Sequence, residues 1–185
     1  MLVRDDDIPT FVSDGVCEYG IVGENVLEEF ALGEPDPRFD VVARLGFGRC
    51  SLRIAAPETA SYAGPSSLEG ARIATSYPRL VRRFLEDSGI AAEVVKMNGA
   101  VELAPRLQIA NFVCDLVSTG ATLEANGLRI GLITGDLPNL PGRWRNVAVA
   151  SAIAGATIAS SAVAGKVIAA AGITGITVSG NNRGH

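Results

Sequence analysis

The chain has 185 residues, of which 48% are hydrophobic and 19% charged, and its formal net charge is −4. This size predicts one compact domain or two small lobes, and the composition excludes a disordered chain and a basic nucleic-acid binder. Three widely spaced cysteines without a CxxC motif, and a single histidine at position 185, argue against a disulfide framework, a zinc site and a histidine-dependent triad. Residues 1–7 lack the apolar segment that is typical of a signal peptide, so we expect a cytoplasmic protein.

Apolar runs bounded by glycine, proline and acidic residues predict alternating strands and helices along the first 129 residues. In chain order we expect a helix at 8–16, a strand at 19–23, a helix at 26–31, strands at 51–56 and 72–75, a helix at 79–88, a strand at 92–96, a helix at 101–107, a strand at 112–117 and a helix at 122–126. This alternation favours an α/β architecture with largely parallel sheets.

The composition changes after Arg129, because residues 130–185 are rich in Ala, Gly, Ile, Val, Ser and Thr and hold only five charged side chains. A stretch with two prolines, 135–142, is typical of a loop or linker. Beyond it we expect a strand at 146–150, a helix at 151–171 and a strand at 173–178. The uncharged run 147–165 has the length of a membrane span, but its small residues give a weak transfer free energy. We therefore favour a helix packed on a sheet over a membrane span.

The segment after the strand at 112–117 carries the clearest chemical signal. A strand, a small-residue turn and a helix point backbone N–H groups at one spot, and a glycine lets a ligand approach the backbone, which is how proteins bind phosphate without a lysine. An aspartate at the strand end can accept hydrogen bonds from ribose hydroxyls. The alternative is an ordinary capped turn. The candidate phosphoribosyl site comprises Asp115, Ser118, Thr119, Gly120, Ala121 and Thr122.

Two further strand-to-helix turns have the same character. Thr75 and Ser76 follow one strand, and Gly23 and Glu24 follow another. Helix capping and a solvated helix start are the alternative explanations. Three such turns in one α/β chain fit a ligand held in a cleft at the carboxyl ends of strands.

At these residues the chain closely resembles the ATP phosphoribosyltransferases, the first enzymes of histidine biosynthesis. The resemblance runs from Val3 to about Arg129 and is most specific in the segment 114–128, CDLVSTGATLEANGL. It also includes RDDDIP at 4–9, GIVGENVLEE at 20–29, LGFGRC at 45–50, RIATSYP at 72–78, NGAVE at 98–102 and APR at 104–106. The acidic insertion at 33–39 resembles the long-form branch of that family.

The resemblance implies a two-lobed fold like the type II periplasmic binding proteins, with residues 1–56 and 130–185 in the first lobe and 57–129 in the second. It implies transfer of phosphoribosyl from phosphoribosyl pyrophosphate (PRPP) to N1 of ATP, with Mg²⁺ accompanying the pyrophosphate, in a homo-oligomer. The family loop that matches 115–123 binds the 5′-phosphate and ribose, and the position of Glu102 lies near the ribose. The positions of Gly23 and Glu24 lie near the nucleotide, and we expect Thr75 and Ser76 to bind the nucleotide as well. No catalytic residue and no protein ligand to a metal is assigned.

Two alternatives stay open at this point. Family members carry a strand, a basic loop and a helix before the segment that matches Arg4, and residues 130–185 match nothing in the family. The tail either replaces the missing structural unit or is unrelated, frame-shifted or engineered. The function is accordingly that of an ATP phosphoribosyltransferase or of a non-catalytic phosphoribosyl- and nucleotide-binding remnant.

Overall fold

The computed structural model describes residues 3–60, 62–130 and 144–152, and it divides the chain into two compact units. Unit 1 contains the described residues up to Arg49 together with 144–152, and unit 2 contains those from Cys50 to 130. The two-lobed α/β expectation places residues 50–56 in the first lobe. In the structure they belong to unit 2, because Ser51–Pro57 forms the strand β3, which pairs with β6 and β7 of that unit.

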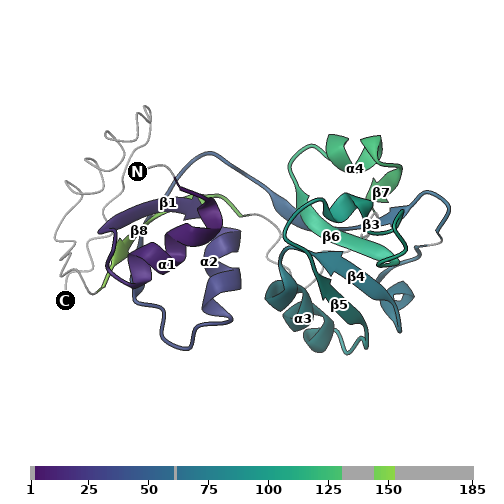
Figure 1. Cartoon of the computed structure of the whole chain (residues 1–185), viewed down its shortest axis with the longest axis horizontal. Helices are drawn as coiled ribbons and strands as arrows, with labels where there is room; N and C mark the ends of the chain where they lie inside the picture. The colour runs from purple at the N-terminus through teal and green to yellow at the C-terminus, as the bar shows by residue number, and fades with distance from the viewer. Residues whose placement is uncertain (1–2, 61, 131–143, 153–185) are drawn as a thin grey trace, which may run out of the picture. The chain divides into compact units, whose positions relative to one another are not determined.

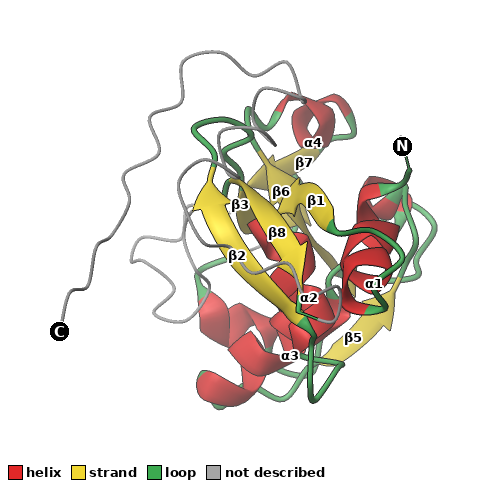
Figure 2. Cartoon of the chain, turned by 90° about the vertical axis from the view of Figure 1, so that its left-hand side faces the viewer, coloured by secondary structure: helices red, strands yellow, loops and turns green. Residues whose placement is uncertain are grey.

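Unit 1 is built on a three-stranded sheet whose order is β1-β8-β2 (Figures 1 and 2). Its elements are the 3₁₀ helix η1 (Asp5–Asp7), α1 (Ile8–Ser13), β1 (Tyr19–Gly23), α2 (Glu24–Ala31), β2 (Phe39–Arg44) and β8 (Asn146–Ser151). The central strand β8 is antiparallel to both neighbours. The expected mostly parallel pairing is therefore not found in this sheet. The first residues of β8 pair with the last residues of β1 and β2, so β8 runs in the opposite direction to both.

The buried residues of unit 1 explain why β8 occupies the centre of the sheet. Val147 and Val149 are fully buried, and Val149 lies opposite Gly20 of β1 on one side and Val41 of β2 on the other. A strand that is buried along its length carries the continuous apolar sequence found at 147–150. The expected strand at 146–150 is confirmed and includes Ser151, so the helix expected from 151 does not begin at that residue. The rest of the expected helix, from 153 to 171, and the expected strand at 173–178 lie outside the described residues.

Unit 2 is built on a five-stranded sheet whose order is β5-β4-β6-β3-β7 (Figure 1). Its elements are β3 (Ser51–Pro57), η2 (Pro65–Leu68), β4 (Arg72–Thr75), α3 (Pro78–Asp87), β5 (Glu93–Lys96), η3 (Val101–Leu103), β6 (Phe112–Val117), α4 (Ala121–Ala125) and β7 (Leu128–Ile130). Strands β5, β4 and β6 are mutually parallel, whereas β3 is antiparallel to β6 and β7. The sheet is thus mixed, and α3 is the helix of a parallel βαβ unit.

The helix α3 follows from its sequence. Pro78 occupies its first turn, where a missing N–H costs nothing, and Gly89 follows its end in the left-handed conformation with φ +66°. Leu80 and Phe84 lie one turn apart and are buried. The expected helix at 101–107 is instead the short η3, which ends two residues before Pro105, a residue without a backbone donor.

No helix within the described ranges is long and apolar enough to cross a membrane.

Candidate functional site

The candidate phosphoribosyl loop lies between β6 and α4 in unit 2. Ser118, Thr119 and Thr122 are exposed there, so their hydroxyls can reach a ligand. Gly120 is buried and has φ +86°. Any residue other than glycine adopts this left-handed backbone conformation at a cost of roughly 1–2 kcal/mol. A Cβ atom at this position would lie 2.8 Å from Cδ1 of Ile130, so the backbone favours glycine and a larger residue would also force that methyl group to shift.

An apolar cluster beneath the loop holds its parts in place. Val101 of η3, Val113 of β6 and Leu123 of α4 are buried in one cluster. Their sequence neighbours include Glu102 and Thr122, which are therefore positioned by the same packing. Residues that are far apart along the chain thus come to one face of unit 2 through their apolar neighbours.

Asp115 is half-buried and lies within electrostatic reach of Glu102. Burial raises the pKa of Asp115 above its ordinary value, and the charge of Glu102 raises the pKa further. A hydrogen bond of 2.8 Å from the backbone N–H of Leu116 to Oδ1 of Asp115 acts in the opposite direction and lowers it. A half-buried acid with a like charge beside it is typical of functional sites and stabilises the fold poorly. The structure thus brings together these two residues of the predicted site.

Thr75 and Ser76 follow β4, which is parallel to β6 and next to it in the sheet. Their turn therefore lies at the same edge as the loop after β6. Thr75 is fully buried, and its Oγ1 accepts a hydrogen bond of 3.0 Å from the backbone N–H of Tyr77. That oxygen stabilises the turn, as the capping alternative expects, whereas Ser76 is half-buried.

Gly23 and Glu24 lie in unit 1, where β1 passes into α2. A Cβ atom on Gly23 would collide with Oδ1 of Asn25, so a larger residue there would force the Asn25 side chain to shift. The carboxylate of Glu24 accepts from Arg44, whose Nε and Nη2 each lie 3.0 Å from Oε1. The sequence did not indicate this partner, because Arg44 follows Glu24 by 20 residues and only the shared sheet edge brings them together.

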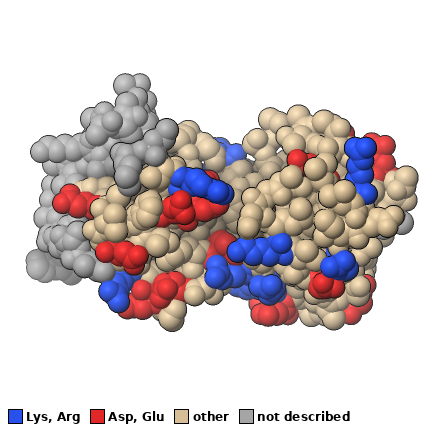
Figure 3. Space-filling model, viewed as in Figure 1, with Lys and Arg blue, Asp and Glu red and all other residues tan. Residues whose placement is uncertain are grey.

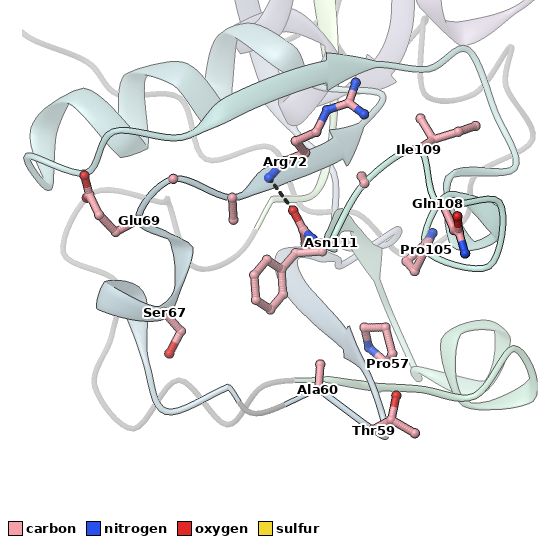
Figure 4. A pocket seen from close by; sticks show the side chains of 14 residues that line it. Pro57, Thr59, Ala60, Ser67, Glu69, Arg72, Pro105, Gln108, Ile109 and Asn111 are labelled. Atoms are coloured by element: carbon pink, nitrogen blue, oxygen red, sulfur yellow. Dashed lines mark hydrogen bonds between the residues drawn. The ribbon is translucent and has the colours of Figure 1, made fainter.

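A surface pocket of about 570 Å³ lies at the other edge of the sheet of unit 2, where β4 and β6 begin (Figure 4). Its wall includes Arg72 and Asn111, which are joined by a hydrogen bond of 2.9 Å from the backbone N–H of Arg72 to Oδ1 of Asn111. None of the residues that the sequence analysis selected lines it. The pocket and the candidate loop therefore lie at opposite ends of the parallel strands.

Two observations bear on cofactors and charge. Among the described residues, no three His, Cys, Asp or Glu side chains are grouped so that they could hold a metal ion. On the face shown in Figure 3, cationic and anionic side chains are interspersed on both units, in keeping with the small net charge.

The thiol of Cys114 is buried, and burial raises its pKa, so it is a packing residue and not a nucleophile.

The comparisons with known proteins agree with the motifs in the first 130 residues. The family model of HisG, ATP phosphoribosyltransferase, matches residues 4–133. An ATP phosphoribosyltransferase from Maricaulis maris (strain MCS10) is 57% identical over 130 residues. This match covers 70% of the chain and 44% of the relative, so the chain spans less than half the length of that protein.

Solved structures extend the comparison to the fold. The complex of ATP phosphoribosyl transferase (HisG:HisZ) from Thermotoga maritima matches with a TM-score of 0.68 and 25% identity, over 92% of this chain and 75% of that one. The alkanesulfonate-binding protein SsuA from Xanthomonas axonopodis pv. citri matches with a TM-score of 0.62 and 17% identity, over 89% of this chain and 57% of that one, which shows the fold alone. The expected likeness to two-lobed binding proteins is confirmed. From its motifs, its fold and these matches, the chain belongs to the ATP phosphoribosyltransferase family.

Proposed function

We propose that the protein transfers the phosphoribosyl group of PRPP to N1 of ATP, the first step of histidine biosynthesis. The observation that carries the proposal is the loop after β6, where the half-buried Asp115 precedes the exposed hydroxyls of Ser118 and Thr119, in a chain of this family. The loop offers exposed hydroxyls to a phosphate, and the carboxylates of Asp115 and Glu102 can accept hydrogen bonds from ribose hydroxyls.

The chemistry matches what these residues can supply. The bond from C1′ to the pyrophosphate oxygen breaks, and the pyrophosphate leaves with the electron pair. The lone pair of adenine N1 then forms the new bond to C1′. Such a reaction needs a ribose held in a fixed orientation and an anionic environment for positive charge developing at the sugar, and it needs no histidine or nucleophilic cysteine.

We also propose that Mg²⁺ enters together with PRPP. Magnesium is usually held by one or two carboxylates and by substrate phosphates, not by a closed protein cage. Asp115 and Glu102, the two carboxylates of the candidate phosphoribosyl site, are the residues that would take this role, and Glu102 lies within electrostatic reach of Asp115. When bound, the ion neutralises charge on the departing pyrophosphate.

A non-catalytic phosphoribosyl-binding protein is the second candidate. It is favoured by the location of Asp115, Glu102 and the 118–122 loop in unit 2 alone. Binding of PRPP then needs only that unit, whereas transfer also needs the nucleotide residues, which include Gly23 and Glu24 in unit 1.

We propose a cytoplasmic homo-oligomer as the working assembly. The Thermotoga relative was solved as a HisG:HisZ complex, so the assay described next is performed with and without a HisZ-type subunit.

The activity is tested by incubating the protein with ATP, PRPP and Mg²⁺ and detecting phosphoribosyl-ATP and pyrophosphate by mass spectrometry. Calorimetry then compares PRPP binding by Asp115→Asn, Gly120→Val and the control Asp87→Asn, which removes one charge from the exposed end of α3. We expect Asp115→Asn and Gly120→Val to bind PRPP at least tenfold more weakly, a loss of about 1.4 kcal/mol. The control Asp87→Asn should bind PRPP with the affinity of the wild type. Product formation supports the enzyme, and PRPP binding without product supports the second candidate. Unchanged affinity in both loop variants would remove the site.

A further inference from the structure

The sheet edge at which β1 and β2 end forms a distinct surface of unit 1. Both strands are antiparallel to β8, so Gly23 and Arg44, their last residues, lie at the edge at which β8 begins with Asn146. Gly23 pairs directly with Asn146 in the sheet. The entry into β8 therefore lies beside the turn that the sequence analysis assigned to nucleotide binding.

Backbone hydrogen bonds fix residues 145 and 146 at this edge. The N–H of Glu24 donates to the carbonyl of Arg145 at 2.9 Å. Asn146 accepts from the N–H of Leu45 at 2.8 Å and donates to the carbonyl of Phe47 at 3.2 Å. Residues 145 and 146 thus join the turn at 23–24 to the turn at 45–47. Arg145 nevertheless lies outside the residues 4–133 that match the family model.

The charges at this edge do not balance. The carboxylate of Glu24 is paired with Arg44, which neutralises both. Arg49 is exposed and Arg145 half-buried, and within the described ranges neither forms an ion pair. Arg145 therefore has no carboxylate partner among the residues that the structure describes. Phe47, whose carbonyl accepts from the N–H of the next residue, Asn146, has a side chain that is 41% exposed.

We propose that Arg145 binds the phosphates of ATP at this edge of unit 1. The identity of the ligand rests on the proposed function, and the position rests on the hydrogen bond from Glu24 to Arg145. A guanidinium that pairs with no carboxylate in the described part of the chain is a strong donor to phosphate. The exposed ring of Phe47, on the turn whose backbone bonds to Asn146, suits a ligand that also carries a base. Arg145 is thus a nucleotide-binding residue that the family match does not contain.

The test measures ATP affinity by calorimetry in the full-length protein. Arg145→Gln keeps the backbone carbonyl that Glu24 needs and removes only the charge. Arg38→Gln is the matched control, since Arg38 is exposed at the opposite end of β2 and also loses one charge from unit 1. We expect at least tenfold weaker ATP binding for Arg145→Gln, partial recovery in Arg145→Lys, and unchanged PRPP binding in all three variants.

The outcomes separate this inference from the proposed function. Equal ATP affinities of Arg145→Gln and Arg38→Gln overturn the role of Arg145, while product formation by the wild type leaves the transferase standing. A wild type that binds ATP through Arg145 but forms no product supports the inference and overturns the transferase. A wild type that does not bind ATP overturns the inference.

Discussion

Burial and the charge of Glu102 raise the pKa of Asp115 above its ordinary value of 3.8. The folded protein then holds this proton more tightly than the unfolded chain does, so stability falls as the pH rises from 3.8 through the folded pKa. We expect Asp115→Asn to raise the Tm at pH 7, by roughly 2–4 °C for each kcal/mol gained. Thermal melts across pH check this, because the gain should shrink as the pH falls towards 3.8.

The same variant should lose PRPP affinity, since its amide accepts fewer hydrogen bonds than the carboxylate. Stability and binding would then change in opposite directions, as is common at functional sites. A gain in Tm that stays constant with pH would contradict the assignment of the raised pKa to Asp115.

Gly120 and Gly127 allow backbone strain to be separated from packing. Both have positive φ, +86° and +69°, but a Cβ atom at Gly127 would meet open space. Gly127→Ala should therefore cost only the left-handed backbone penalty, roughly 1–2 kcal/mol. Gly120→Ala should cost more, because its Cβ atom also meets Ile130. Urea unfolding of both variants gives the difference, and equal free energies of unfolding would show that Ile130 moves aside freely.

At the scale of elements, β8 is the strand on which unit 1 depends. The described residues of β1 and β2 pair only with β8, so neither strand has another partner within the part of the chain that the structure describes. Val149→Asp places a carboxylate in a fully buried position, and such a charge without a partner costs several kcal/mol. We expect amide protection in β1 and β2 to be lost, as measured by hydrogen exchange.

The matched control is Val41→Asp, because Val41 lies opposite Val149 in the sheet but is 47% exposed. It should retain the protection that Val149→Asp loses. Full protection in both variants would mean that the buried face of β8 does not hold the sheet together.

At the scale of the whole molecule, the division into two units gives Val149→Asp a second consequence. The phosphoribosyl loop and its apolar cluster lie entirely in unit 2, whereas Arg145, Glu24 and Phe47 lie in unit 1. The variant is therefore expected to keep PRPP binding and to lose ATP binding. Trp144, the single tryptophan, is buried in unit 1, so its fluorescence reports on the folding of that unit in the same samples.

Several elements were predictable because their signals are local. The apolar residues 112–117 and the turn at 118–120 indicated both β6 and the loop after it, and Pro78 and Gly89 bounded α3. Strand β2 was not predicted. Its residues Phe39–Arg44 are largely exposed or half-buried, and only their hydrogen bonds to β8 define the strand.

The sequence alone determined the strand–turn–helix segments, the place of the glycine turn at 120 and the family, because these depend on neighbouring residues and on ordered motifs. Only the tertiary structure decided that β8 lies between β1 and β2, that Glu102 lies near Asp115, and that Arg145 stands beside Glu24. Sheet pairing and Coulomb interactions join residues that are distant along the chain. Their partners are therefore selected by the packing of the whole unit and not by local sequence.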